Sequence, residues 1–233
     1  MRRASFFDID GTLIRSQMIF DFPRYLHKEG LFEDKYLINI LKIIMEYEIN
    51  FIPYREAGKR ILRNYAEALK GKKRSLIEKK SKDFMEGHIK KKYAYTDELI
   101  DILKKDTVLI AISASPIEQV EALKKYIPFA HVFGTVLETK NGIYTGKIKT
   151  NLLVKNSKQK AQLSIAKKLN IDLKNSFAFG DSDADIEYLA LAGHPIALNP
   201  NSHLKDIAEK NSWPIFHEKD DIVTRIKEIL DKK

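Results

Sequence analysis

The spacing of hydrophobic residues along this chain changes more than once. An apolar run at residues 4–7 predicts a short buried strand. After a long gap, five more apolar runs predict strands, at residues 107–112, 131–133, 177–179, 195–198 and 214–216. Within the gap, apolar residues recur at helical spacing, which predicts helices at residues 20–28, 35–47, 54–69 and 76–92. The chain therefore alternates between an α/β pattern and a purely helical one.

The later strands are separated by helical patterns, which is typical of parallel strands joined by crossover helices. We therefore expect an α/β fold with a Rossmann-like parallel sheet flanked by helices, formed by residues 1–15 and 96–233. Residues 16–95 would form an all-helical domain inserted after the first strand. The Asn141-Gly142 pair predicts a small hairpin.

Two carboxylates directly follow the first predicted strand. Asp8 and Asp10 lie two residues apart and are followed by Gly11, which allows backbone to approach a ligand closely. Carboxylates at this spacing can serve one reacting group while their surroundings push their pKa values apart. The pair is consistent with Asp8 as a nucleophile and Asp10 as an acid and base.

A second acidic cluster follows the predicted strand at residues 177–179. The carboxyl ends of strands in an open parallel sheet line one crevice, so Asp8, Asp181 and Asp185 are expected around one point. Clustered carboxylates repel one another unless a cation binds, and a site of few oxygen ligands suits Mg²⁺. Capping of the following helix explains Ser182 or Asp183 but not the whole cluster.

Two further residues suit a phosphate site. Ser113 lies between a strand and the helix predicted from residue 117, where a hydroxyl and free amides favour an anion, although an ordinary helix cap explains Ser113 equally well. Lys160 opens another helical pattern and would supply a positive charge, with Lys158 as its competitor.

Taken in chain order, the segments at Asp8, Ser113, Lys160 and Asp181 resemble the signature of the haloacid dehalogenase superfamily of aspartate-nucleophile phosphohydrolases. The resemblance spans residues 8–185. It implies that Asp8 is phosphorylated and that Asp10 protonates the leaving group. It further implies that Ser113 and Lys160 hold the phosphoryl group.

The same resemblance implies a bound Mg²⁺ and a set of substrate contacts. The metal would be held by Asp8, the main-chain carbonyl of Asp10, Asp181 and Asp185. The expected substrate contacts are Gly11, Thr12, Ser113, Ala114, Gln17 and Arg60.

A helical insertion after the first catalytic strand resembles the type-1 cap of the phosphoserine-phosphatase-like branch. In that branch a Glu nine residues after the nucleophile recognises the substrate amine, but this chain has Gln17 there, and the Ser after the second Asp is Gly11. A neutral Gln loses the charge pairing with an ammonium group. Arg60 falls near the place of the Arg that grips the substrate carboxylate, although a solvated helix-face arginine is the simpler explanation.

The composition of the chain excludes several kinds of chemistry and bears on where the protein is located. The chain has 233 residues and no cysteine, which excludes disulfides, thiolate catalysis and Cys-ligated zinc. Met1 leads almost directly into the first strand, so no signal peptide is expected, and the most apolar stretch, residues 36–49, is too short to span a bilayer. We expect a cytoplasmic protein.

Charge is uneven along the chain. The net charge is +9, and residues 16–95 hold 18 Lys and Arg against 11 Asp and Glu. This basic helical segment favours anionic or lipid-like substrates or surfaces, or is simply a set of solvated lysines. No aromatic interleaving typical of single-strand binding accompanies it, so no specific nucleic-acid binding is expected. Nothing in the sequence sets an oligomeric state.

The sequence thus favours a Mg²⁺-dependent phosphomonoester hydrolase that acts on a small phosphorylated metabolite or lipid head group. The alternatives are phosphoserine phosphatase proper, or a phosphotransferase or phosphate-sensing protein that uses the same aspartyl phosphate. An intact Asp10 favours hydrolysis over sensing, since a sensor needs no acid for a leaving alcohol.

Overall fold

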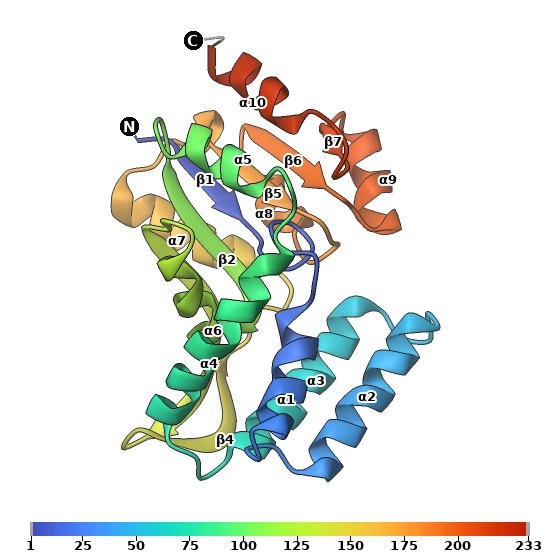
Figure 1. Ribbon diagram of the computed structural model, residues 1–233. Helices are drawn as coiled ribbons and strands as arrows, with labels where there is room; N and C mark the ends of the chain where they lie inside the picture. The colour runs from blue at the N-terminus through green and yellow to red at the C-terminus, as the bar shows by residue number, and fades with distance from the viewer. Residues whose placement is uncertain (1, 232–233) are drawn as a thin grey trace.

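The computed structural model describes residues 2–231 and contains one seven-stranded sheet (Figure 1). Its strand order is β4-β3-β2-β1-β5-β6-β7, and all neighbouring strands are parallel except β3 and β4. The strands are β1 (Ala4–Phe7), β2 (Val108–Pro116), β3 (His131–Lys140), β4 (Ile143–Thr150), β5 (Phe177–Gly180), β6 (His194–Leu198) and β7 (Ile215–Phe216). The expected α/β class with a mostly parallel sheet is confirmed.

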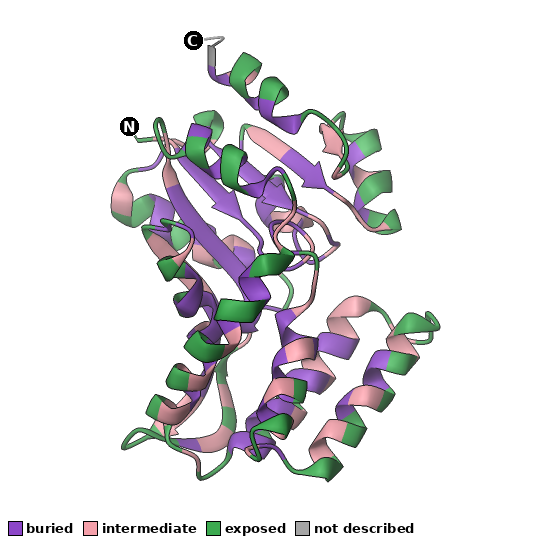
Figure 2. Cartoon of the chain, viewed as in Figure 1, coloured by how far each residue is buried: buried purple, intermediate pink, exposed green. Residues whose placement is uncertain are grey.

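Helices cover both faces of this sheet because its central strands are apolar on both sides (Figure 2). Phe7 packs on one face with α5 (Thr96–Leu103), α6 (Ile117–Ala122) and α10 (Ile222–Asp231). Phe6, one residue earlier, points to the other face and packs with α7 (Ser157–Leu169), α8 (Ile186–Leu189) and α9 (Ser202–Lys210). Short 3₁₀ turns span Ile89–Lys91, Leu123–Lys125 and Leu173–Asn175.

The first four of the five α-helices between β1 and β2 form the lower part of the molecule in Figure 1. They are α1 (Met18–Lys28), α2 (Asp34–Glu48), α3 (Tyr54–Leu69) and α4 (Arg74–His88). We call residues 18–91 the helical insert. The four helices occupy the segments where helical spacing predicts them, with boundaries that differ by at most four residues.

The helical insert has its own apolar core, which includes Phe22, Ile40 and Leu62. The predicted hairpin closes at Asn141 and Gly142, both with positive φ, and its strands β3 and β4 reach this core. Leu137 and Tyr144 of the hairpin pack there among the helices of the insert. The hairpin therefore joins the insert to the sheet.

No helix within residues 2–231 is long and apolar enough to cross a membrane.

Candidate active site

The carboxyl ends of β1 and β5 lie side by side and define the site. The main-chain N–H of Asp8 donates to the carbonyl of Phe179 over 2.9 Å, so the chain after β1 follows the end of β5. The buried hydroxyl of Tyr188 bridges the same two strands: it accepts from the N–H of Asp8 at 3.1 Å and donates to the Phe179 carbonyl. Asp8 and Asp181 are thereby brought close together, as parallel-strand geometry predicts.

Three carboxylates and one lysine form the centre of the site. One oxygen each from Asp8, Asp181 and Asp185 lies within 4.8 Å of the others. The ammonium group of Lys158 is buried, 2.6 Å from Oδ1 of Asp8 and 2.5 Å from Oδ1 of Asp185. Burial acts to lower the pKa of Lys158, but the two carboxylates outweigh it and hold this pKa above its ordinary value.

The surroundings of Asp8 and Asp181 raise the pKa values of both carboxyl groups. Burial raises the pKa of Asp8 to about 7, against the lowering effect of Lys158. Burial, followed by the charges of Asp8 and Asp185, raises the pKa of Asp181 well above its ordinary range. Such a crowded set of carboxylate oxygens matches the donors that a hard divalent cation prefers, so these residues fit a metal ion.

Asp185 organises the loop after β5 as well as facing Lys158. Its Oδ2 accepts from the N–H of Asp181 at 3.1 Å and from the N–H of Ser182 at 3.0 Å. Asp183, expected to cap the following helix, instead lies against Arg55 of the helical insert, with Arg55 Nε 3.5 Å from its Oδ2. The helix-capping interpretation of Asp183 is therefore replaced by a contact between insert and core.

Asp10 points to a different set of partners from Asp8. Its Oδ1 accepts from the N–H of Met18 at 2.7 Å, and its Oδ2 accepts from the hydroxyls of Ser115 at 2.7 Å and Ser113 at 3.4 Å. Burial raises the pKa of Asp10 to about 6, against the lowering effect of these hydrogen bonds. A carboxyl group with a pKa near neutrality is suited to giving and taking a proton.

The structure corrects the choice of lysine. Lys160 lies two positions after Lys158 on α7 and lines a separate cavity with Val132 and Phe133 of β3. Residues two apart on a helix point in nearly opposite directions, so only one of these lysines faces the aspartates. Lys158, which the sequence offered as the competitor, takes that place.

Close packing explains two of the glycines. A Cβ on Gly11, whose φ is +82°, would lie 2.1 Å from Oδ2 of Asp181, so the side chain of Asp181 approaches β1 only because Gly11 has none. The hydroxyl of Thr12 donates to Oδ1 of Asp181 at 3.3 Å. Likewise a Cβ on Gly180 would lie 2.6 Å from the Cβ of Asp185.

Ser113 and Ala114 lie at the carboxyl end of β2. The Ser113 hydroxyl accepts from the N–H of Ser115 at 3.1 Å and donates to Asp10, so it is inside the site. Ala114 is buried, and its carbonyl accepts from the hydroxyl of Thr135 at 2.7 Å. Ser113 therefore contacts Asp10, while the carbonyl of Ala114 already accepts a hydrogen bond from Thr135 of β3.

Gln17 reaches the site through a tyrosine of the helical insert. Its Oε1 accepts from the hydroxyl of Tyr54 at 3.0 Å, and the next residue, Met18, donates to Asp10. Burial, followed by the charge of Asp10 and then that of Asp8, raises the pKa of Tyr54 well above its ordinary value. Tyr54 and Gln17 therefore border Asp8 and Asp10 from the insert side.

The structure also corrects the choice of arginine. Arg60 forms an ion pair with Glu46 of α2, and both line a cavity in the helical insert that contains none of the aspartates. Arg55, one turn earlier on α3, instead donates to Glu187 at 2.7 Å and to the carbonyl of Asp183 at 2.8 Å. Arg55 is therefore the arginine of the helical insert that touches the loop carrying the acidic cluster.

Four residues of this site were not predicted from the sequence: Ser115, Tyr188, Tyr54 and Arg55. Ser115 sits two residues after Ser113 in the same small-residue segment, so the local pattern contained a signal for it. Tyr188 and Arg55 act across more than 100 residues of chain, on Asp8 and on Glu187 respectively, and carried no such signal.

Comparisons with known proteins agree on one family. The family model described as haloacid dehalogenase-like hydrolase matches residues 5–190. A phosphoserine phosphatase of Mycobacterium tuberculosis is 25% identical over 230 residues, which cover 91% of this chain and 70% of that protein. A phosphoserine phosphatase of Methanocaldococcus jannaschii is 27% identical over 211 residues, with 89% and 90% covered.

Solved structures share the fold. A Bordetella pertussis protein of unknown function superposes with a TM-score of 0.75 at 20% identity and covers 94% of this chain and 99% of its own. A phosphoserine phosphatase described as a phospho-aspartyl intermediate analogue superposes with a TM-score of 0.67 at 24% identity, with 99% and 98% covered.

Proposed function

The chain belongs to the haloacid dehalogenase-like hydrolases and is a phosphatase, and on this premise we propose that it is a Mg²⁺-dependent phosphomonoester hydrolase that works through an aspartyl phosphate on Asp8. One observation carries the proposal. Asp8 is held at the end of β1 in an ion pair with the buried ammonium of Lys158, while Asp10, two residues on, accepts hydrogen bonds from Met18 and Ser115. The two carboxylates thus have the separate surroundings that a nucleophile and an acid require.

The residues divide the chemistry as follows. An oxygen of Asp8 attacks the substrate phosphorus, and the bond from phosphorus to the leaving alcohol breaks as the bond to Asp8 forms. Asp10 gives its proton to the leaving oxygen, for which its pKa of about 6 is suited. Asp10 then takes a proton from the water that attacks phosphorus, so that phosphate leaves and Asp8 is restored.

Charge neutralisation comes from two sources in this proposal. Lys158 places a cation beside Asp8 and the incoming phosphoryl oxygens. Asp8, Asp181 and Asp185, with the main-chain carbonyl of Asp10, would hold a Mg²⁺, which when bound neutralises charge on the phosphoryl oxygens.

The helical insert acts as a cap over the site in this proposal. Tyr54 and Arg55 at the start of α3 lie against Gln17 and against the loop after β5. The ordered contacts between insert and core support exclusion of water from the reacting groups, which strengthens the electrostatic interactions among them.

The substrate is proposed to be a small phosphate ester. The relatives named phosphoserine phosphatase make phosphoserine the second candidate. Gln17 argues against a dedicated phosphoserine enzyme, because the amide oxygen beside Tyr54 is neutral and pairs less strongly with a substrate ammonium than a carboxylate does.

A panel of phosphate esters, assayed for phosphate release with Mg²⁺ and again with excess EDTA, tests the proposal. We expect turnover that EDTA abolishes and added Mg²⁺ restores, no turnover by Asp8→Asn with its circular dichroism unchanged, and a raised Mg²⁺ requirement in Asp181→Asn. Asp183→Asn is the matched control, since Asp183 faces Arg55. A full rate in EDTA contradicts the metal requirement, and phosphorylated Asp8 that never releases phosphate indicates a transferase or sensor.

A further inference from the structure

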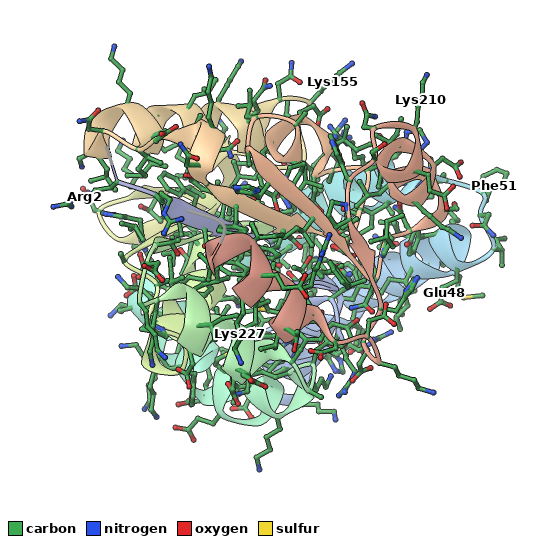
Figure 3. The ribbon with its side chains drawn as sticks, turned by 90° about the horizontal axis from the view of Figure 1, so that it is seen from above. Arg2, Glu48, Phe51, Lys155, Lys210 and Lys227 are labelled. Atoms are coloured by element: carbon green, nitrogen blue, oxygen red, sulfur yellow. The ribbon has the colours of Figure 1, made fainter. Side chains whose placement is uncertain are left out.

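A group of exposed apolar side chains lies on the helical insert. Ile38, Met45 and Ile49 are 49%, 64% and 73% exposed, and Phe51 in the loop after α2 is 75% exposed. Only three other large apolar side chains in residues 2–231, Ile143, Val154 and Leu163, are comparably exposed, and none of them belongs to the insert. In Figure 3, Phe51 projects outward at the edge of the molecule beyond α2.

These residues share one side of the helix. Ile38, Lys42, Met45 and Ile49 follow the spacing i, i+4, i+7, i+11, which places them on one stripe of an α-helix. The stripe lies opposite the buried side of α2, which carries Ile40 and Ile44. We call Ile38, Lys42, Met45, Ile49 and Phe51 the outer α2 face.

A cavity of about 310 Å³ adjoins this face in the groove between α2 and α3. It is lined by three cationic side chains, one carboxylate, two amides and one apolar side chain, namely Lys42, Arg60, Arg63, Glu46, Asn39, Asn64 and Ile43. Arg60 is paired with Glu46, but within residues 2–231 neither Lys42 nor Arg63 has an ion-pair partner. We call it the cation cavity; Lys42 belongs both to it and to the outer α2 face.

Positive charge and exposed apolar side chains together favour one kind of partner. An apolar helix face flanked by Lys and Arg binds at the interface of an anionic bilayer, where apolar groups enter the acyl boundary and cations meet lipid phosphates. A symmetric contact between two copies of this chain would set the unpaired Lys42 and Arg63 of each copy close to those of the other, which like-charge repulsion opposes.

We propose that the outer α2 face docks on a membrane surface that contains anionic phospholipids, with a headgroup phosphate in the cation cavity. The cation cavity contains none of the residues of the aspartate site, although Phe51 also lines a second cavity with Tyr54 and Asp183. The inference therefore does not depend on the proposed phosphatase activity. It gives a role to Arg60 and to part of the positive charge of the insert.

Sedimentation of the full chain with vesicles tests this proposal. One vesicle preparation is phosphatidylcholine alone, and in the other about a third of the lipid is phosphatidylglycerol. We expect binding to the anionic vesicles only, and weaker binding at higher ionic strength. Absence of binding to anionic vesicles overturns the proposal.

Two double variants locate the contact. Lys42→Gln with Arg63→Gln should weaken vesicle binding about tenfold or more, because two cations meet the headgroups. Ile49→Ser with Phe51→Ser should weaken it comparably through lost apolar burial. The matched control is Lys155→Gln with Lys210→Gln, which removes the same charge from exposed sites on other elements (Figure 3) and should change binding less than about threefold.

The remaining outcomes each decide against the proposal. An equal loss in the control variant means diffuse attraction rather than a site. Unchanged binding by the Ile49 and Phe51 variant means that the outer α2 face does not enter the bilayer. Saturable binding of inorganic phosphate that needs Lys42 and Arg63, without vesicle binding, means a site for soluble anions. A dimer that these variants disrupt means a contact between copies. Thermal melts of each variant confirm that it is folded.

Discussion

The Arg55 guanidinium of the helical insert donates to the Glu187 carboxylate of the core over 2.7 Å. Both side chains are largely buried, at 18% and 20% exposed, and the same Arg55 nitrogen also donates to the carbonyl of Asp183. A charge-assisted contact in such a position is stronger than an exposed ion pair. It therefore fixes the start of α3, and with it Tyr54, against the loop that carries the acidic cluster.

Breaking this contact should loosen the insert over the site. We expect Arg55→Gln and Glu187→Gln each to lower kcat/KM by about tenfold, equivalent to roughly 1–2 kcal/mol. The double variant should be no worse than Arg55→Gln alone, since Arg55→Gln already removes the contact with Glu187. Lys59→Gln on the same helix is the control. Effects that multiply in the double variant would show that Arg55 acts on the substrate rather than through Glu187.

The two lysines of α7 provide a matched pair. Lys158→Gln should lower kcat by about 100-fold or more, because it removes the cation beside Asp8. Lys160→Gln should stay within about twofold, since Lys160 lines a different cavity. Steady-state kinetics on one good substrate, with circular dichroism to confirm folding, decide between them. Comparable losses in both variants would contradict the placement of Lys158.

The role of Asp10 should depend on the leaving group. Asp10→Asn should lower turnover of an alkyl phosphate by about 10²–10⁴-fold, because an alkoxide needs a proton as it leaves. The loss should be much smaller with p-nitrophenyl phosphate, whose leaving group barely needs an acid. Rapid-quench measurement of Asp8 phosphorylation separates this step from hydrolysis. An equal defect with both esters would assign Asp10 a different role.

Gln17 gives a test of substrate charge. We expect Gln17→Glu to raise kcat/KM for L-phosphoserine by roughly ten- to a hundred-fold, the value of a charge-assisted pair with the substrate ammonium. The rate for an ester without the amine should not rise. Tyr54 can donate to either side chain, so Tyr54→Phe controls for its contact with residue 17. Phosphoserine as the best substrate of the wild type, with no gain in the variant, would refute this reasoning.

His88 at the end of α4 predicts a pH-dependent stability. Its side chain is buried, packs against the ring of Phe84 and has Nε2 3.1 Å from the hydroxyl of Ser16. Burial lowers the pKa of His88 to about 4, with Lys91 acting in the same direction and Asp21 against it. The folded state therefore keeps His88 neutral where the unfolded chain binds a proton. The contribution of neutral His88 to the free energy of unfolding is complete above pH about 6.5 and is lost as the pH falls toward about 4.

Chemical denaturation of the wild type and of His88→Gln across this pH range measures the effect. The difference in unfolding free energy between the two should fall by up to about 3 kcal/mol from pH 7 to pH 4. The raised pKa values of Asp8 and Asp10 act with the opposite sign, so only the difference between the proteins isolates His88. A difference that does not change with pH would mean that His88 is charged in the folded state.

The local sequence pattern alone was sufficient to predict the fold class and to place the residues that directly follow the strands. The α/β class is confirmed because short apolar runs and helical spacing report burial directly, element by element. Asp8 and Asp181 each follow a strand within one or two residues, so their meeting required only that β1 and β5 be parallel neighbours. The helices of the insert were likewise predictable from their spacing.

The position of Lys158 was decided partly by the local sequence pattern and partly by the tertiary structure. The buried residues of α7 are Lys158, Gln162, Ile165 and Ala166. Lys158 and Ile165 are seven residues apart and therefore lie on the same side of the helix. Lys160 is in register instead with Leu163, which is 45% exposed. The helical spacing therefore indicates that Lys158, and not Lys160, lies on the buried side of α7. That this side faces the aspartates is decided by how α7 packs against the sheet.

Contacts across long stretches of chain were decided by the tertiary structure alone. Arg55 meets Glu187, and the Tyr188 hydroxyl meets the N–H of Asp8, between segments more than 100 residues apart. Periodicity records which side of an element is buried, but it does not record which element lies opposite. Arg60 and Arg55 both lie on the same helix, and only the docking of α3 on the core placed Arg55 against the acidic loop and left Arg60 in the groove beside α2.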